Sequence, residues 1–221
     1  MQIRKTDNTQ FSSRNKTIRL ADDISRRVNI AFPRISPSKI ATKNNSNKFT
    51  TLIERLNTGI SDEVREETKE MYLEANTFMA EILAILKPVK KYKLGNCGES
   101  AHIGTIAAKV NGIKDCCPAY LYKNYGEDLD HMAVYVYDKK KPYIIDPWLG
   151  FADYLDNTIT RYKNEFASIL EIEPEEDIGF VCRIDDGYTD TLKNEFTKRQ
   201  KNKLAKIFPK MKINKYYANN Q

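Results

Sequence analysis

One stretch, KLGNCGESAHIGTIAAKV at residues 93–110, places the strongest constraint on how this chain folds. Its apolar residues recur at the three- and four-residue steps of one helix face, and small residues fill most of the remaining positions. Asn96 is a preferred N-cap residue, and Glu99 has the position of the acid in a capping box. The stretch therefore predicts a mostly buried helix with Cys97 in its first turn, and its apolar face holds Ile103, Ile106, Ala107 and Val110.

A cysteine in the first turn of a helix has two readings. The first backbone N–H groups of a helix lack intrahelical partners, and the helix dipole places partial positive charge there. Both effects favour the thiolate, which is the nucleophilic form of cysteine. The alternative is a buried, inert structural cysteine. The position of Cys97 leaves both open until its neighbours are considered.

The remaining pattern predicts an α+β fold. Helices are expected first, then a β-hairpin, and then mixed elements, an order unlike the βαβ alternation of a parallel sheet. An amphipathic pattern predicts a long helix over residues 62–87 that Pro88 ends. The other helices are expected at residues 49–56, 153–170 and, as a basic helix, 189–208. The strands are expected at residues 119–122, 131–137, 142–146 and 178–184.

The expected domain organisation is a polar N-terminal arm followed by one domain. Residues 1–50 hold few apolar residues and contain Pro33 and Pro37, so this arm cannot build a core of its own. It either wraps on the rest of the protein or stays mobile. Residues 51–221 are expected to form the main domain, since 41% of the chain is hydrophobic.

Charge and hydropathy exclude several classes of protein. No apolar run reaches the roughly 18 residues of a membrane-spanning helix, and the N-terminus lacks the apolar region of a Sec signal peptide. The expected location is the cytoplasm or, by a non-Sec export route, a host cell. The net charge of +6 fits an acidic partner or surface but is too small to indicate nucleic-acid binding.

The four cysteines, Cys97, Cys116, Cys117 and Cys182, are all interpreted as reduced thiols. Adjacent Cys116 and Cys117 are poor partners for each other, and no signal peptide points to an oxidising compartment. No CxxC or HxxxH spacing is present, so neither a metal site nor a cofactor is expected.

Two histidines are available to serve Cys97 as a base. His102 lies five residues further along the same helix, and at about 100° per residue the two side chains point about 140° apart. His131 begins a predicted strand, and Asp146 ends the next one, at the same open end of the hairpin. Cys97, His131 and Asp146 are therefore predicted to act as nucleophile, general base and orienting acid.

This order of residues resembles the papain-like and transglutaminase-like thiol enzymes. The segments that carry the resemblance are GNCGESA, DHMAVYVY and YIIDPWLG, within about residues 92–151. The last of them resembles bacterial papain-like toxins and type III effector cysteine proteases. The close spacing of His and Asp is similar to that in arylamine N-acetyltransferases and effector glutamine deamidases. The resemblance implies a papain-like core, a protein substrate and a secreted bacterial effector involved in virulence.

Two departures from these families bear on the site. The glutamine that precedes the cysteine in papain is absent, so the oxyanion hole is expected to use the Cys97 N–H and a second donor, for which Asn96 is the candidate. The arginine- and glycine-rich lead-in of arylamine N-acetyltransferases is also missing, which disfavours an acetyl carrier. Trp148 either lines the site as a substrate-binding wall or is a core aromatic.

Two function classes follow. The first is a cysteine-dependent hydrolase or acyl transferase acting on protein amides, as a protease, a glutamine deamidase or a transglutaminase. The second is a non-catalytic binding module on a degenerate thiol-enzyme fold that works through the basic C-terminal helix. That segment is either a solvated helix face or a docking patch for an acidic partner or an anionic membrane. Its basic residues are Lys193, Lys198, Arg199, Lys201, Lys203, Lys206, Lys210, Lys212 and Lys215.

Overall fold

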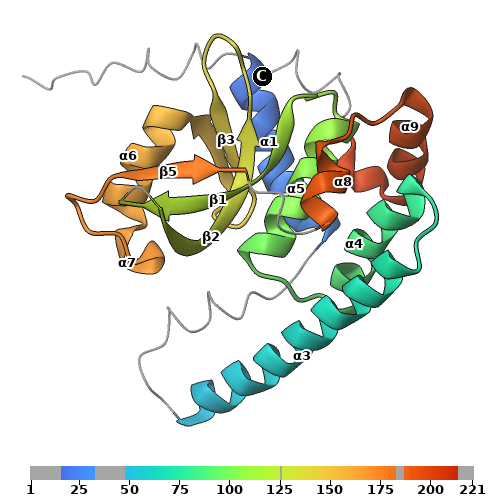
Figure 1. Cartoon of the computed structure of the whole chain (residues 1–221), viewed down its shortest axis with the longest axis horizontal. Coiled ribbons are helices and arrows are strands. Elements are labelled where there is room, and N and C mark those ends of the chain that lie inside the picture. The colour runs from blue at the N-terminus through green and yellow to red at the C-terminus, as the bar shows by residue number, and fades with distance from the viewer. Residues whose placement is uncertain (1–15, 33–47, 125, 183–186, 214–221) are drawn as a thin grey trace, which may run out of the picture.

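The computed structural model describes residues 16–32, 48–124, 126–182 and 187–213, and their fold is α+β, as the sequence predicts (Figure 1). All neighbouring strands of its five-stranded sheet are antiparallel, and their order is β4-β3-β2-β1-β5. The strands are β1 (Cys116–Lys123), β2 (Glu127–Val136), β3 (Tyr143–Asp146), β4 (Phe151–Tyr154) and β5 (Ile178–Val181). The helices are α1 (Lys16–Ala31), α3 (Lys48–Leu73), α4 (Phe78–Tyr92), α5 (Cys97–Val110), α6 (Leu155–Glu165), α7 (Ala167–Leu170), α8 (Gly187–Lys193), α9 (Lys198–Ile207) and the 3₁₀ turn η2 (Pro209–Met211).

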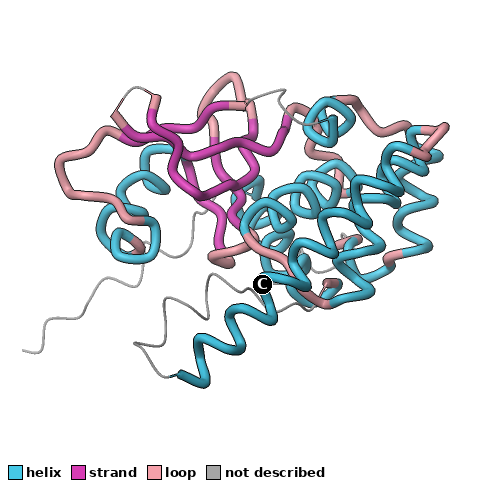
Figure 2. Tube along the Cα trace, turned by 60° about the horizontal axis from the view of Figure 1, so that its bottom comes forward, coloured by secondary structure: helices cyan, strands magenta, loops and turns pink. Residues whose placement is uncertain are grey.

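Helices cover both faces of the sheet (Figure 2). Successive strand residues point to opposite faces, and both faces here are apolar. Val134 and Val136 of β2 pack into the larger core with α1, α4 and α5. Leu129 of β2 and Leu121 of β1 pack into a smaller core with α6 and α7. The sheet is therefore enclosed between two apolar layers, and its strands read as nearly continuous hydrophobic runs.

Helix α5 begins at Cys97, as predicted, and lies at the centre of the larger core. Gly104 is the point of closest approach, because a Cβ atom there would lie 2.6 Å from Cγ of Pro147 and 3.0 Å from a methyl group of Val134. A helix this close to a sheet needs small residues on the facing side. Gly104 is such a residue.

The N-terminal arm contains a helix that the sequence reading did not foresee. The buried residues of α1 recur at three- and four-residue steps and join the larger core: Ile18, Ala21, Ile24 and Val28. The side chain of Asp22 accepts a hydrogen bond from the backbone N–H of Ala152 in β4. Helix α1 is therefore tied to the edge of the sheet, whereas residues 1–15 and 33–47 of the predicted arm lie outside the described residues.

The prediction of one helix over residues 62–87 is wrong, because two helices with different bounds cover this segment. Helix α3 starts at Lys48, includes the short helix expected at residues 49–56, and ends at Leu73. A new helix, α4, starts after Thr77, whose hydroxyl accepts a hydrogen bond from the N–H of Ala80. Pro88 does not end α4 but lies inside it, because burial of the surrounding apolar face holds the helix despite one missing backbone donor.

Three further predictions need correction. The helix predicted at residues 153–170 is divided into α6 and α7, and strand β4 precedes them. The basic helix predicted at residues 189–208 is likewise two helices, because Thr197 forms a capping box with Gln200 and starts α9 anew. Strand β5 ends at Val181, and residues 183–184 of the predicted strand lie outside the described residues.

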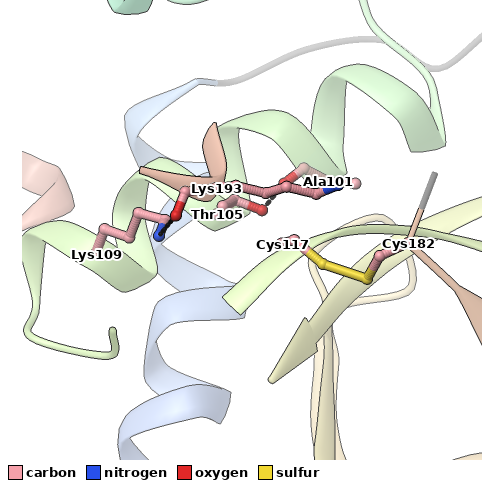
Figure 3. Close-up of a disulfide and its surroundings, with 6 residues drawn as sticks. All are labelled: Ala101, Thr105, Lys109, Cys117, Cys182 and Lys193. Carbon is pink, nitrogen blue, oxygen red and sulfur yellow. Dashed lines mark hydrogen bonds between the residues drawn. A yellow bond between two sulfur atoms is a disulfide. The ribbon is translucent and has the colours of Figure 1, made fainter. Parts of the chain in front are cut away.

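The interpretation of all four cysteines as reduced thiols is also wrong. Cys117 of β1 and Cys182, directly after β5, form a disulfide that joins two neighbouring strands (Figure 3). Cys97 and Cys116 are free thiols. No helix in the described residues is long and apolar enough to cross a membrane.

Candidate functional site

The first turn of α5, the middle of β2 and the end of β3 meet beside a cavity of about 610 Å³. Cys97, the first residue of α5, lines this cavity together with His131 of β2. Asp146, the last residue of β3, lies behind His131 and is fully buried. The structure thus brings together the three residues that the sequence predicts as nucleophile, base and orienting acid.

An irregularity in β2 determines where His131 lies. Tyr120 of β1 pairs with Met132, whereas Tyr122 pairs with Asp128, so one residue of β1 faces three residues of β2. The extra residues form a β-bulge that ends at His131. Bulges bend a strand and re-aim its side chains, and they are frequent beside active sites. This bulge brings the backbone carbonyl of Asp130 to 3.8 Å from the Cys97 sulfur.

The pairing of β2 with β3 brings His131 to Asp146. Val134 pairs with Ile145, so the next step of this antiparallel register sets Asp146 opposite Ala133. His131 is two residues from Ala133 and therefore shares a sheet face with Asp146. Its Nε2 atom lies 2.8 Å from Oδ2 of Asp146. The two side chains are only 2% and 0% exposed, so this interaction is shielded from water and salt.

Electrostatics favour the charged form of both partners. Burial alone would lower the pKa of His131, but the Asp146 carboxylate, and then the Cys97 thiol, outweigh burial and raise the pKa to about 10. Burial would raise the pKa of Asp146, but His131 and the hydrogen bonds from Leu149 and Tyr162 hold that pKa below its ordinary value. The pair is therefore an imidazolium and a carboxylate at neutral pH.

Two further donors fix the Asp146 carboxylate. The hydroxyl of Tyr162, from α6, donates to Oδ2 over 2.7 Å, and the backbone N–H of Leu149 donates to Oδ1 over 2.9 Å. The Tyr162 side chain is fully buried, and its hydroxyl is also 3.4 Å from Nε2 of His131. Burial, and then the neighbouring carboxylate, raise the pKa of Tyr162 well above its ordinary value, so it remains a donor. The sequence reading missed Tyr162, which it treated as one position in a predicted helix.

Helix α1 supports the same corner through the backbone. The hydroxyl of buried Ser25 donates to the carbonyl of Asp146 over 3.0 Å, and the amide of Asn29 donates to the carbonyl of Pro147 over 3.2 Å. Both residues lie more than 100 positions before their partners, so sequence pattern contains no signal for them. They complete the hydrogen bonding at a point where β3 ends inside the protein.

The second ring nitrogen of His131, Nδ1, is the one available to the Cys97 thiol. Nδ1 is buried and makes no hydrogen bond of normal geometry with any described residue. The Cys97 thiol nevertheless interacts with the His131 ring and contributes to its raised pKa. With Nε2 engaged by Asp146, Nδ1 is the ring atom that remains to exchange a proton with the thiol.

The helix start is built as predicted around Asn96 and Glu99. The Glu99 carboxylate accepts a hydrogen bond from the backbone N–H of Asn96 over 2.7 Å and forms an ion pair with Arg65 at 3.3 Å. Burial would raise the pKa of Glu99, but these two donors hold it below its ordinary value. Asn96 lines the cavity beside Cys97, which is the position that its candidate role as an oxyanion donor requires.

Trp148 and His102 lie outside the arrangement of Cys97, His131 and Asp146. Trp148 is not among the described residues that line the cavity. Instead it packs against the His131 ring, with the ring centres 5.3 Å apart, and helps to hold that ring in place. His102 lines the cavity but contacts Tyr188 of α8, with the ring centres 6.0 Å apart. It is His131, and not His102, that forms the hydrogen bond with Asp146.

The cavity walls mix apolar and charged groups from several elements. The wall formed by α4, β1, β2 and α8 is mainly apolar, and α3 contributes polar groups that include Arg65 and Lys69. In the described part of the chain, no group of three or more His, Cys, Asp or Glu side chains is arranged to hold a metal ion. Comparison of the chain with family models, curated proteins and solved structures finds no match in any of the three.

Proposed function

We propose that this chain is a cysteine-dependent amide hydrolase or acyl transferase with Cys97, His131 and Asp146 as its catalytic residues. The observation that carries the proposal is the buried, hydrogen-bonded His131–Asp146 pair beside a helix-start cysteine that lines the same cavity. A buried charge pair is a poor stabilising device, since well-packed apolar residues would serve as well. Its position in and behind the wall of a cavity, next to a thiol, favours a catalytic use.

The chemistry follows from the three side chains. The Cys97 thiolate attacks the amide carbonyl, a carbon–sulfur bond forms, and the carbonyl electron pair moves to oxygen. His131 gives its Nδ1 proton to the leaving nitrogen as the carbon–nitrogen bond breaks. Neutral His131 then removes a proton from water, or from an amine, which attacks the acyl-enzyme and releases Cys97. Asp146 keeps the ring oriented and stabilises the imidazolium throughout.

The developing oxyanion needs donors at the helix start. The backbone N–H of Cys97 lies at the N1 position, where helix amides have no intrahelical partner. We assign the second donor to the side chain of Asn96, which lines the cavity at the adjacent position. Donors fixed in this way stabilise negative charge that forms only in the transition state.

We propose a protein substrate, and export as the route by which the enzyme reaches it. The sequence resembles secreted bacterial effector proteases and deamidases, whose substrates are host proteins. The Cys117–Cys182 disulfide also favours passage through an oxidising compartment, because such bonds are rare in a reducing cytoplasm. Reaction with water would make the enzyme a protease or a glutamine deamidase, and reaction with an amine would make it a transglutaminase.

Intact-mass spectrometry of candidate protein substrates tests the proposal. Fragments indicate proteolysis, exchange of NH₂ for OH indicates deamidation, and a joined amine indicates transglutamination. Cys97→Ala should abolish the product, whereas Cys116→Ala should retain it, because the Cys116 thiol is buried and its burial raises its pKa to about 12. Absence of any product with the wild type would favour the alternative, a non-catalytic binding module on a degenerate thiol-enzyme fold, and equal products from wild type and Cys97→Ala would rule out Cys97 as the nucleophile.

A further inference from the structure

A second hollow lies where the ends of α1, α4 and α9 meet. It has a volume of about 370 Å³, and none of the described residues lines both this hollow and the Cys97 cavity. Its apolar lining includes Ile30 at the end of α1, Ile207 at the end of α9, and Phe208 directly after it. These residues come from the two ends of the described chain.

The hollow has a buried aromatic residue at its base and exposed apolar residues at its rim. Phe208 is only 5% exposed and packs against Phe32, with the ring centres 5.2 Å apart. Ile30 and Ile207, in contrast, are 57% and 40% exposed. Single exposed isoleucines are ordinary on a protein surface, but two at the rim of one hollow form a patch that an apolar side chain can cover.

The charged residues in the described part of the lining are all basic. Among the described residues, Lys90, Lys93 and Lys210 line the hollow, and no acidic residue does. The Nζ atom of Lys90 lies 4.9 Å from the centre of the Phe208 ring, so a cation is held directly at the floor. Among the described residues, none of these three lysines pairs with a carboxylate. Helix α9 adds further basic residues and contains no acid.

The hollow and the candidate active site involve different faces of α4. Val89 lines the Cys97 cavity, whereas the next residue, Lys90, lines the hollow. An occupant of the hollow would therefore leave the Cys97 cavity open.

We propose that this hollow docks an acidic segment of a protein partner. One apolar side chain of the partner enters between Ile30 and Ile207 and covers Phe208, while neighbouring carboxylates pair with Lys90, Lys93 and Lys210. Charge complementarity selects the acidic sequence. The concave shape favours a peptide over a membrane, because a bilayer binds the protruding apolar face of an amphipathic helix. This proposal does not depend on the catalytic one, since docking is measured without turnover.

Fluorescence anisotropy with two labelled synthetic peptides tests the proposal. The probe is a short acidic peptide with a central phenylalanine, and its control has serine at that position with the same charge. We expect the phenylalanine peptide to bind at least about tenfold more tightly, and more weakly as salt rises. Lys90→Glu and Ile30→Ser should each weaken its binding about tenfold or more. Lys140→Glu, which makes the same charge change at an exposed turn, should have little effect.

Three outcomes would overturn the proposal: equal affinity for the two peptides, binding that is indifferent to Lys90 and Ile30, or no binding of the phenylalanine peptide. Sedimentation with vesicles of phosphatidylcholine and phosphatidylserine is the parallel measurement. Vesicle binding that depends on Lys90 and Ile30, without binding of the phenylalanine peptide, would identify a membrane surface instead. Urea unfolding of each variant separates loss of docking from loss of folding.

Discussion

Nε2 of His131 lies 2.8 Å from Oδ2 of Asp146, and both side chains are shut off from solvent. The contact joins residues 15 positions apart, across the β2–β3 hairpin. It leaves Nδ1 of His131 without a partner of normal geometry among the described residues, next to the cavity that Cys97 lines. An oriented imidazolium beside a helix-start thiol is the arrangement on which the catalytic proposal rests.

Removal of the Tyr162 hydroxyl should weaken this pair without disturbing the fold. Tyr162→Phe deletes a donor to Asp146, so the pKa of Asp146 should rise and its carboxylate should hold the His131 ring less firmly in place. A hydrogen bond to a charged group contributes about 1.5–3 kcal/mol. Tyr162 acts on Cys97 only through Asp146 and His131, so we expect a smaller effect there: alkylation of Cys97 at mildly acidic pH should slow roughly three- to tenfold. The pH profile of iodoacetamide labelling is the measurement.

The matched control is Tyr122→Phe, on a half-buried tyrosine outside this hydrogen-bonded corner. If substitution of His131 changes the labelling profile but Tyr162→Phe leaves it at the wild-type profile, then Tyr162 contributes only packing at this site. A wild-type profile that does not depend on His131 would instead remove the basis of the catalytic proposal.

The stability of the protein should fall as pH rises above about 6.5. The folded-state pKa of His131, about 10, exceeds the ordinary value of 6.5. The unfolded state therefore loses the proton first, and the stabilisation that the proton provides is lost between these two values. Asp146 acts in the opposite direction, since its lowered pKa stabilises the fold above 3.8 and this contribution is lost in acid.

Urea unfolding between pH 5 and pH 10 checks this dependence. The difference in stability between wild type and His131→Gln should be largest near pH 6 and should shrink as pH rises. A constant difference across this range would show that the His131 proton does not contribute to folding.

The sequence predicts the proposed catalytic trio because each member has a local signal. Cys97 follows a good N-cap, and His131 and Asp146 belong to strands with clear apolar and β-branched patterns. The residues that hold the trio in place have no such signal. Ser25 meets Asp146 across 121 positions, and Tyr162 reaches it from a helix whose packing the sequence does not reveal.

The same reasoning explains the errors. The disulfide requires β1 and β5 to be neighbours in the sheet, a topology that no pattern near Cys117 or Cys182 encodes. The break between α3 and α4 depends on the cap at Thr77, a weaker signal than the apolar periodicity that runs across it. Burial likewise overrides the usual helix-breaking effect of Pro88.

Gly104→Ala should separate α5 from the strand that carries Asp146. The new Cβ atom would lie 2.6 Å from Cγ of Pro147, the residue directly after Asp146, and a proline ring yields little. We expect a loss of about 1–3 kcal/mol in the free energy of unfolding and slower labelling of Cys97. Gly59→Ala in α3 is the control, since its Cβ meets nothing within 4 Å and should stabilise the helix slightly. Equal effects of both substitutions would mean that this close approach is unimportant.

Loss of the disulfide should destabilise the protein substantially. Cys117 and Cys182 are 65 positions apart, and closing a loop of this length in the unfolded chain is worth about 4 kcal/mol by the chain-entropy relation. Cys182→Ser should lower the urea midpoint, and dithiothreitol should lower the wild-type midpoint to a similar value. A midpoint that is insensitive to reductant would show that the two thiols are not joined in solution.

The reactivity of Cys97 tests whether it is a nucleophile or an inert structural cysteine, and the test needs no knowledge of a substrate. Cys97 should be the most rapidly alkylated cysteine at mildly acidic pH, because it is a free, partly exposed thiol in the first turn of a helix and lies beside the His131 imidazolium. Cys116 should react slowly, since burial raises its pKa to about 12, and disulfide-bonded Cys117 and Cys182 should not react. His131→Ala should move the labelling curve of Cys97 to higher pH, and His102→Ala should leave it largely unchanged. Peptide mapping after iodoacetamide treatment gives both curves, and a curve that responded to His102 but not to His131 would reassign the base.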